Sequence, residues 1–231
     1  MPRLSARPLF ALVLLGCSGS QGSAAARAAD AATLQAPAVT APAAKGDSVL
    51  AMADAGRILG SAKAGVWMII ISDFQCPFCK RWHDETWAAV RKDYVDTGKL
   101  RVAYVNLPLS MHRNALPAAE VAMCAGVQDK FWPVQDALFR AQREWADAAD
   151  PQPVFETFAR AAGVDMDSLR ACVQSGATRP LIQGDVDRAT TAGASSTPMF
   201  FIGGRALLGA QPLSAFRGAI DAALAALPAG R

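Results

Sequence analysis

The feature that most constrains this chain is an apolar run that leads directly into a pair of cysteines. Residues 65–72, GVWMIIIS, form a continuous apolar stretch, which is typical of a strand buried on both faces. Cys76 and Cys79 follow in QCPFCK, where Pro77 suits the first position of a helix. The pattern predicts a buried strand, a cysteine pair at the next turn, and a helix from Pro77 to Gly98.

The remaining elements define the fold class. Residues 99–109 alternate before Pro108 and predict a second strand, so the first two strands and their helix form a βαβ unit with parallel strands. The apolar residues recur at helical spacing over about residues 114–193. Residues 197–209 then predict a β-hairpin, and residues 212–227 predict an amphipathic helix. The order predicts an α/β fold, a thioredoxin-type core with an inserted all-helical subdomain.

Length and charge exclude some classes of protein. A chain of 231 residues, of which 52% are hydrophobic, can bury a core in one domain. The net charge of +3 comes entirely from residues 1–46, and acidic and basic side chains balance in the remainder. This balance gives no indication of nucleic-acid binding.

The N-terminus resembles an export signal, which we assign to residues 1–17. Basic residues precede the apolar residues 8–16, a stretch much shorter than the roughly 18–20 residues of a membrane-spanning helix. LLGC resembles a bacterial lipobox in which Cys17 is lipidated; ordinary cleavage near AARAAD is the alternative. Residues 18–46 are rich in Ala and Pro and predict a flexible tether to a domain at residues 47–231. Both interpretations predict an extracytoplasmic location, in a bacterial periplasm or cell envelope.

The cysteine pair fits redox chemistry best. At a helix N-terminus, backbone N–H groups and the helix dipole lower the pKa of Cys76, so we expect its thiolate to be the nucleophile. Cys79, one turn later, can then attack the mixed disulfide and resolve it. Zinc sites share this spacing, but no second such pair follows, and we interpret His83 as a surface residue of the helix. An inert disulfide here would close a very short loop and add little stability. We expect no metal and no cofactor.

Three motifs occur in a recognisable order. They are SDFQCPFCKRWHDETW, NLPLSMHRNALPAAEVAMCAG with DKFWPVQDALF, and SSTPMFFIGG. With them the chain resembles, from about residue 47 onward, the DsbA-like branch of the thioredoxin superfamily. Members of that branch are extracytoplasmic thiol:disulfide oxidoreductases with a helical domain inserted in the thioredoxin fold.

The resemblance implies roles for individual residues. Cys76 is the nucleophile and Cys79 the resolving cysteine, with Pro77 and Phe78 as the dipeptide that tunes their potential. Thr197 and Pro198 form the loop whose cis-proline faces the active site. An extended turn there would expose backbone groups with which a client peptide can pair.

One position departs from the family. Many relatives carry, six residues before the first cysteine, a buried acidic residue that assists proton transfer at the resolving thiol; this chain has Ile70. Proton transfer at Cys79 must then depend on solvent, Lys80 or another group. Asp73 is a candidate, although an Asp at a strand end is more often a turn or cap residue.

The remaining cysteines permit two interpretations. Cys124 and Cys172 are each in phase with apolar neighbours, as two buried thiols would be. In an oxidising compartment the same pair favours a structural disulfide, and related proteins have a second pair in this region.

Other side chains near the motifs have simpler expected roles. We expect His112 in a loop or cap, because no third group is visible to orient it. Trp82 and Trp87 are expected in the core or lining a groove. Phe78 should be partly exposed and contact apolar client segments.

The leading hypothesis is an extracytoplasmic oxidoreductase that exchanges disulfides with exported proteins or peptides through Cys76 and Cys79. A membrane or soluble redox partner would recharge it, and the lack of an evident dimerisation domain favours a monomer. The alternatives are a disulfide reductase for a narrow client set and a non-catalytic binding or chaperone module, which Ile70 favours.

Overall fold

The structure, a computed structural model, describes residues 48–228. The predicted export signal at residues 1–17, the lipidation site Cys17 and the tether at residues 18–46 lie outside the described residues. The site and its supporting elements are all within the described part of the chain.

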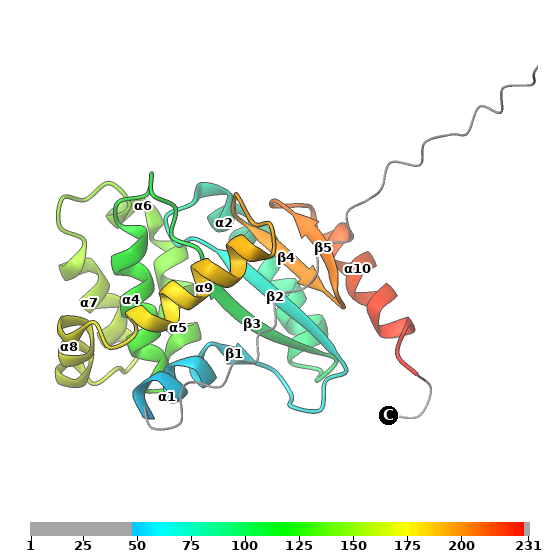
Figure 1. Ribbon diagram of the computed structural model, residues 1–231, viewed down its shortest axis with the longest axis horizontal. Coiled ribbons are helices and arrows are strands. Elements are labelled where there is room, and N and C mark those ends of the chain that lie inside the picture. Colours follow the sequence, from blue (N-terminus) through cyan, green and yellow to red (C-terminus); the bar gives the residue numbers. More distant parts are fainter. Residues whose placement is uncertain (1–47, 229–231) are drawn as a thin grey trace, which may run out of the picture. The chain divides into compact units, whose positions relative to one another are not determined.

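A five-stranded sheet of order β1-β3-β2-β4-β5 organises the fold (Figure 1). β2 and β3 are parallel, whereas β1, β4 and β5 each run antiparallel to their neighbours. The predicted βαβ unit and hairpin are confirmed, but the sequence interpretation missed β1 and the helix before it. The strands are β1 Ile58–Leu59, β2 Val66–Ser72, β3 Leu100–Asn106, β4 Met199–Ile202 and β5 Arg205–Leu208.

The helix after the cysteine pair is less regular than predicted. It begins at Pro77 as expected, but it consists of α2 Pro77–Trp82, the π-helical η1 His83–Trp87, α3 Ala88–Val90 and the π-helical η2 Arg91–Val95. Wider π-type turns inside a helix often occur at functional sites. Here the first of them begins four residues after Cys79.

The helical block predicted at about residues 114–193 is confirmed. It contains α4 Ala115–Gly126, α5 Phe131–Arg140, α6 Gln142–Trp145, α7 Gln152–Ala161, α8 Met166–Ser175 and α9 Arg179–Thr191; α1 Ser48–Gly56 and α10 Leu213–Ala225 flank the sheet region in sequence. α9 lies across one face of the sheet (Figure 1) and contacts β3. Between residues 48 and 228, no helix combines the length and apolar composition needed to cross a bilayer.

Two apolar clusters cover the two faces of the sheet. Ile69 and Ile71 belong to a smaller cluster with Ala189 of α9. Ile70 belongs to the larger cluster, which contains both site cysteines and most of the helical block. The continuous apolar run of β2 is therefore explained by burial on both faces.

A buried ionic cluster joins α9 to the sheet. The Arg57 guanidinium pairs with Asp185, whose side chain is fully buried. Asp185 also accepts hydrogen bonds from the backbone N–H and the Nδ2 group of Asn106, at 3.0 and 2.8 Å. Because each charged group has partners, the cost of burying the charges is offset.

Candidate active site

Cys76 and Cys79 lie where β2 ends and α2 begins. Cys76 is the N-cap of α2 with an extended backbone, and Pro77 occupies the first helical turn. The Cys76 N–H donates to the Asp73 carbonyl at 3.2 Å. Both cysteines are free thiols in this structure, and they are only 3% and 1% exposed.

A second loop, far away in sequence, reaches the cysteine pair. β4 pairs with β2, so the segment before β4 lies at the end of β2 that carries the cysteines. The peptide bond between Thr197 and Pro198 is cis, the isomer that the family resemblance implies. The Cys76 thiol donates to the Thr197 carbonyl oxygen at 3.4 Å.

The two thiols differ strongly in acidity. A hydrogen bond from Cys79 lowers the pKa of Cys76 to about 6, although burial acts in the opposite direction. Interactions with Thr197 and with the backbone N–H groups of Cys79 and Phe78 also contribute to the lowering. The pKa of Cys79 is raised well above its usual value by burial and then by its interactions with Cys76. The arrangement favours a nucleophilic thiolate at Cys76 and a protonated thiol at Cys79.

Asp73 fixes the turn before Cys76. Its Oδ1 accepts from the Gln75 N–H at 2.7 Å, the turn role expected from the sequence. Its Oδ2 accepts from the Leu109 N–H at 2.8 Å and lies 2.7 Å from Nδ1 of His112. His112 is in a loop as predicted, but the sequence did not reveal that Asp73 orients it.

Two amide side chains, those of Gln75 and Gln142, hold the cysteine turn against the helical block. Gln75 donates to the Ala146 carbonyl and accepts from the Asn114 N–H, both at 2.7 Å. Gln142 donates to the carbonyls of Phe74 and Cys76 at 2.7 and 3.1 Å. Sequence reasoning missed this support, because an isolated Gln or Asn carries no pattern that marks its partner.

Two polar residues on the cysteine helix are placed differently from the sequence interpretation. The prediction of His83 as a surface residue is wrong: it is 5% exposed, its Nε2 lies 2.8 Å from Asp136, and its ring stacks on Phe139. Lys80 donates from Nζ to the Phe139 carbonyl at 2.9 Å and pairs with Asp84. The Lys80 amino group thus interacts with the end of α5.

The aromatic residues follow the sequence interpretation. Phe78 is 53% exposed, whereas Trp82 and Trp87 are buried. The Arg81 guanidinium lies over the Phe78 ring, 5.2 Å from its centroid. Within residues 48–228, no three His, Cys, Asp or Glu side chains are grouped as metal ligands would be.

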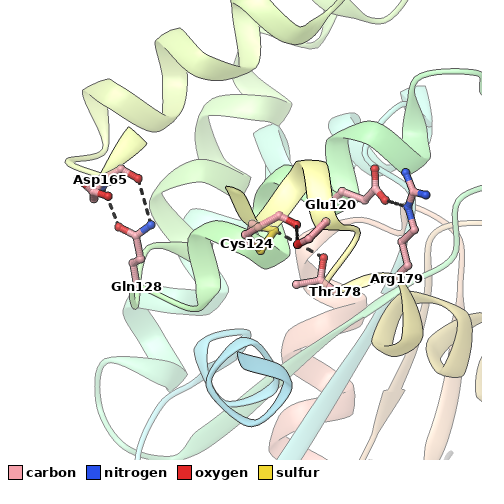
Figure 2. The surroundings of a disulfide bond; sticks show 8 residues. Glu120, Cys124, Gln128, Asp165, Thr178 and Arg179 are labelled. Carbon is pink, nitrogen blue, oxygen red and sulfur yellow. Dashed lines mark hydrogen bonds and ion pairs between the residues drawn. A yellow bond between two sulfur atoms is a disulfide. The ribbon is translucent and has the colours of Figure 1, made fainter. Parts of the chain in front are cut away.

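The second cysteine pair lies in the helical block, where Cys124 of α4 and Cys172 of α8 form a disulfide. Figure 2 shows two side-chain contacts beside it: Gln128, in the turn after α4, exchanges hydrogen bonds with the backbone of Asp165, and Glu120 of α4 pairs with Arg179. Glu120 and Cys124 are spaced four residues apart, so they lie along one face of α4. The disulfide and these contacts fasten α8 and the start of α9 to α4.

Comparison with known families matches most of the chain. A family model described as thioredoxin matches residues 52–222. Among solved structures, oxidised BdbD from Bacillus subtilis superimposes with a TM-score of 0.68 at 19% identity, covering 74% of this chain and 94% of that one. At this identity the structural match establishes a shared fold.

Two relatives illustrate the range of similar sequences. The Na(+)/H(+) antiporter NhaA 1 of Salinispora arenicola is 33% identical over 175 residues, which is 74% of this chain and 25% of that protein. The probable disulfide bond formation protein D of Bacillus anthracis is 23% identical over 149 residues, covering 63% of this chain and 69% of the relative. The chain therefore spans about a quarter of the antiporter's length and about two thirds of the second relative.

Proposed function

Because this chain belongs to the thioredoxin family and has a DsbA-like fold, we propose that it is an extracytoplasmic thiol:disulfide oxidoreductase acting on exported proteins. The observation that carries the proposal is the placement of the two thiols, with Cys76 at the N-cap of α2 against the Thr197 carbonyl and Cys79 inside the same helix. A Cys76 thiol with a pKa of about 6 is largely thiolate at neutral pH, and the neighbouring Cys79 is kept protonated in the core.

The exchange requires only the two cysteines and a client. In the oxidising direction, a client thiolate attacks Sγ of Cys76 in the Cys76–Cys79 disulfide, and Cys79 leaves as a thiolate that takes up a proton. A second client thiolate then attacks the client sulfur of the mixed disulfide, and Cys76 leaves as a thiolate. The client is oxidised by two electrons, and the cysteine pair is reduced by two.

The oxidising direction is favoured by the same thiol. Stabilising the Cys76 thiolate stabilises the reduced pair and makes its disulfide a stronger oxidant. The alternative, a reductase for a narrow client set, requires a pair whose disulfide is more stable than its dithiol. Equilibrating the pair with reduced and oxidised glutathione measures the relative stability of the two forms directly.

The surface beside Cys76 suits an extended client segment. Phe78 is half exposed next to the thiol, and the backbone at Thr197 and Pro198 lies against Cys76. An apolar client side chain can contact the Phe78 ring while its backbone pairs with the loop. Pro77 and Phe78 then contribute both to the potential and to client contact.

The sequence supports a proposal for the attachment of the chain, and the second cysteine pair supports one for its location. A disulfide between Cys124 and Cys172 is typical of oxidising compartments. We place the chain in a bacterial periplasm or cell envelope as a monomer, attached by a lipid on Cys17 through the tether at residues 18–46. A membrane or soluble redox partner would reoxidise the pair after each client.

Two assays test the proposal against a non-catalytic binding module. Wild type should oxidise reduced hirudin and reduce insulin in the presence of dithiothreitol, and Cys76→Ser should do neither. The Cys124→Ala/Cys172→Ala double variant is the control, because it keeps the site cysteines. A wild-type protein inactive in both assays would contradict the proposal.

A further inference from the structure

Cys79 is a buried thiol that must pass through a thiolate during exchange. Resembling proteins carry a buried acidic residue six positions before the first cysteine, but here Ile70 occupies that position and is only 1% exposed. The Asp73 carboxylate is occupied by Gln75, Leu109 and His112. Lys80 is bound to the end of α5. None of these three side chains is therefore free to stabilise the Cys79 thiolate.

The strand next to Ile70 supplies a buried hydroxyl. Tyr104 of β3 pairs in register with Ile70 of β2, and the two residues share the apolar cluster that contains Cys79. The Tyr104 ring is held against Phe74, with ring centroids 5.1 Å apart. Its hydroxyl is fully buried and makes no hydrogen bond to the described residues. A buried hydroxyl without a partner is costly and calls for a functional explanation.

A second buried hydroxyl, that of Ser72, lies on the same strand as Ile70. Ser72 follows Ile70 by two residues on β2, so its side chain projects on the same side of the strand, and it is 3% exposed. Burial and Cys76 raise the pKa of Cys79, and a hydrogen bond from the Asp73 backbone and then one with Ser72 lower it. The pKa of Tyr104 is raised well above its usual value, first by burial and next by Cys79, and is lowered by Ser72.

We propose that the Ser72 and Tyr104 hydroxyls form a buried donor pair that stabilises the Cys79 thiolate by hydrogen bonding. This inference rests on the proposed function and assigns to two hydroxyls the part that an acid plays in the resembling proteins. In this pair Ser72 donates to the reacting sulfur, and Tyr104 is a positioning residue whose hydroxyl donates to Ser72 when the thiolate forms. Because Tyr104 stays neutral over the working pH range, it donates a hydrogen bond and is not a base.

The pair acts when the bond between Cys76 and Cys79 breaks or forms. When a client thiolate attacks Cys76, the electron pair of the disulfide moves to Sγ of Cys79, where the two hydroxyls stabilise the new charge. The proton released by the client thiol then returns to Cys79. In the reverse direction Cys79 loses its proton to solvent and attacks Sγ of Cys76 in the mixed disulfide, and the client sulfur leaves as a thiolate that takes up a proton. No further oxidant or reductant takes part.

Resolution of a mixed disulfide tests this assignment. Cys76 is joined to a peptide thiol, and the rate at which Cys79 releases the peptide is followed by rapid quench from about pH 5 to pH 10. Tyr104→Phe and Ser72→Ala should each slow release about tenfold near neutral pH, as expected for one hydrogen bond to a charged group, and should move the pH midpoint upward. Ser72→Thr keeps a hydroxyl and should restore the rate.

The other tyrosine provides a matched control. Tyr94→Phe removes a hydroxyl that bonds Asp221 at 2.9 Å, and it should leave both the rate and the pH midpoint unchanged. A Tyr104→Phe profile that coincides with wild type would overturn the assignment, as would a uniform loss of rate without a shifted midpoint. If wild type is inactive with insulin and hirudin, the proposed function fails instead.

Discussion

Nδ1 of His112 lies 2.7 Å from Oδ2 of Asp73, so the loop after β3 is tied to the turn that precedes Cys76. The same carboxylate oxygen also accepts from the Leu109 N–H, while Oδ1 caps the turn at Gln75. Asp73 thus joins the turn before the cysteine pair to the loop after β3.

Removing Asp73 should cost more stability than removing His112. Asp73→Ala leaves two backbone N–H groups and the imidazole without an acceptor and should lower the free energy of unfolding by about 3 kcal/mol. His112→Ala leaves both backbone donors satisfied and should cost about 1 kcal/mol. Urea unfolding of the two variants checks the order, and equal losses would show that the imidazole contact dominates.

The reduced protein should become more stable as the pH rises from about 5 to 8. The pKa of Cys76 is about 6 in the folded protein and near 9.0 ordinarily, so in this interval the unfolded chain binds more protons than the folded one. The contribution is lost as the pH falls through 6. Denaturant unfolding at several pH values measures it, together with the thiolate absorbance near 240 nm.

The oxidised protein and Cys76→Ser are the controls for this pH dependence. Neither has a Cys76 thiol to titrate, so both should show a smaller rise in stability over the same interval. A rise as large as that of the reduced wild type in either control would assign the effect to another group.

The disulfide in the helical block should stabilise the fold without serving the exchange reaction. Cys124 and Cys172 are separated by 48 residues, and loss of a cross-link over such a loop costs about 3 to 4 kcal/mol. Cys124→Ala/Cys172→Ala should therefore unfold at lower urea concentration and keep its rate of hirudin oxidation under native conditions. A rate that falls in proportion to stability would show that the disulfide supports the site.

Lys80 should contribute to stability and not to the resolving step. Its ammonium group binds carbonyls at the end of α5, where a positive charge interacts favourably with the helix dipole. Lys80→Met should lower the free energy of unfolding by about 1 kcal/mol and leave the release of a Cys76-linked peptide unchanged. A slower release with a shifted pH profile would instead assign Lys80 to proton transfer at Cys79.

The sequence was informative wherever a pattern is local. The apolar run of β2, the C-x-x-C spacing and Pro77 together indicate a buried strand, a redox pair and a helix start, because each depends on neighbouring residues. β1 could not be found this way, since two residues carry no periodicity. His83 was misplaced because α5, which covers it, follows some fifty residues later in the chain.

The sequence by itself determined the fold class, the candidate cysteine pair and the departure at Ile70, because these depend on residue types and spacings. Only the tertiary structure decided what surrounds the pair. Pairing of β4 with β2 brings Thr197 to Cys76, and pairing of β3 with β2 brings Tyr104 beside Ile70. Contacts across strands depend on register and burial, which become definite only when the sheet and its helices pack together.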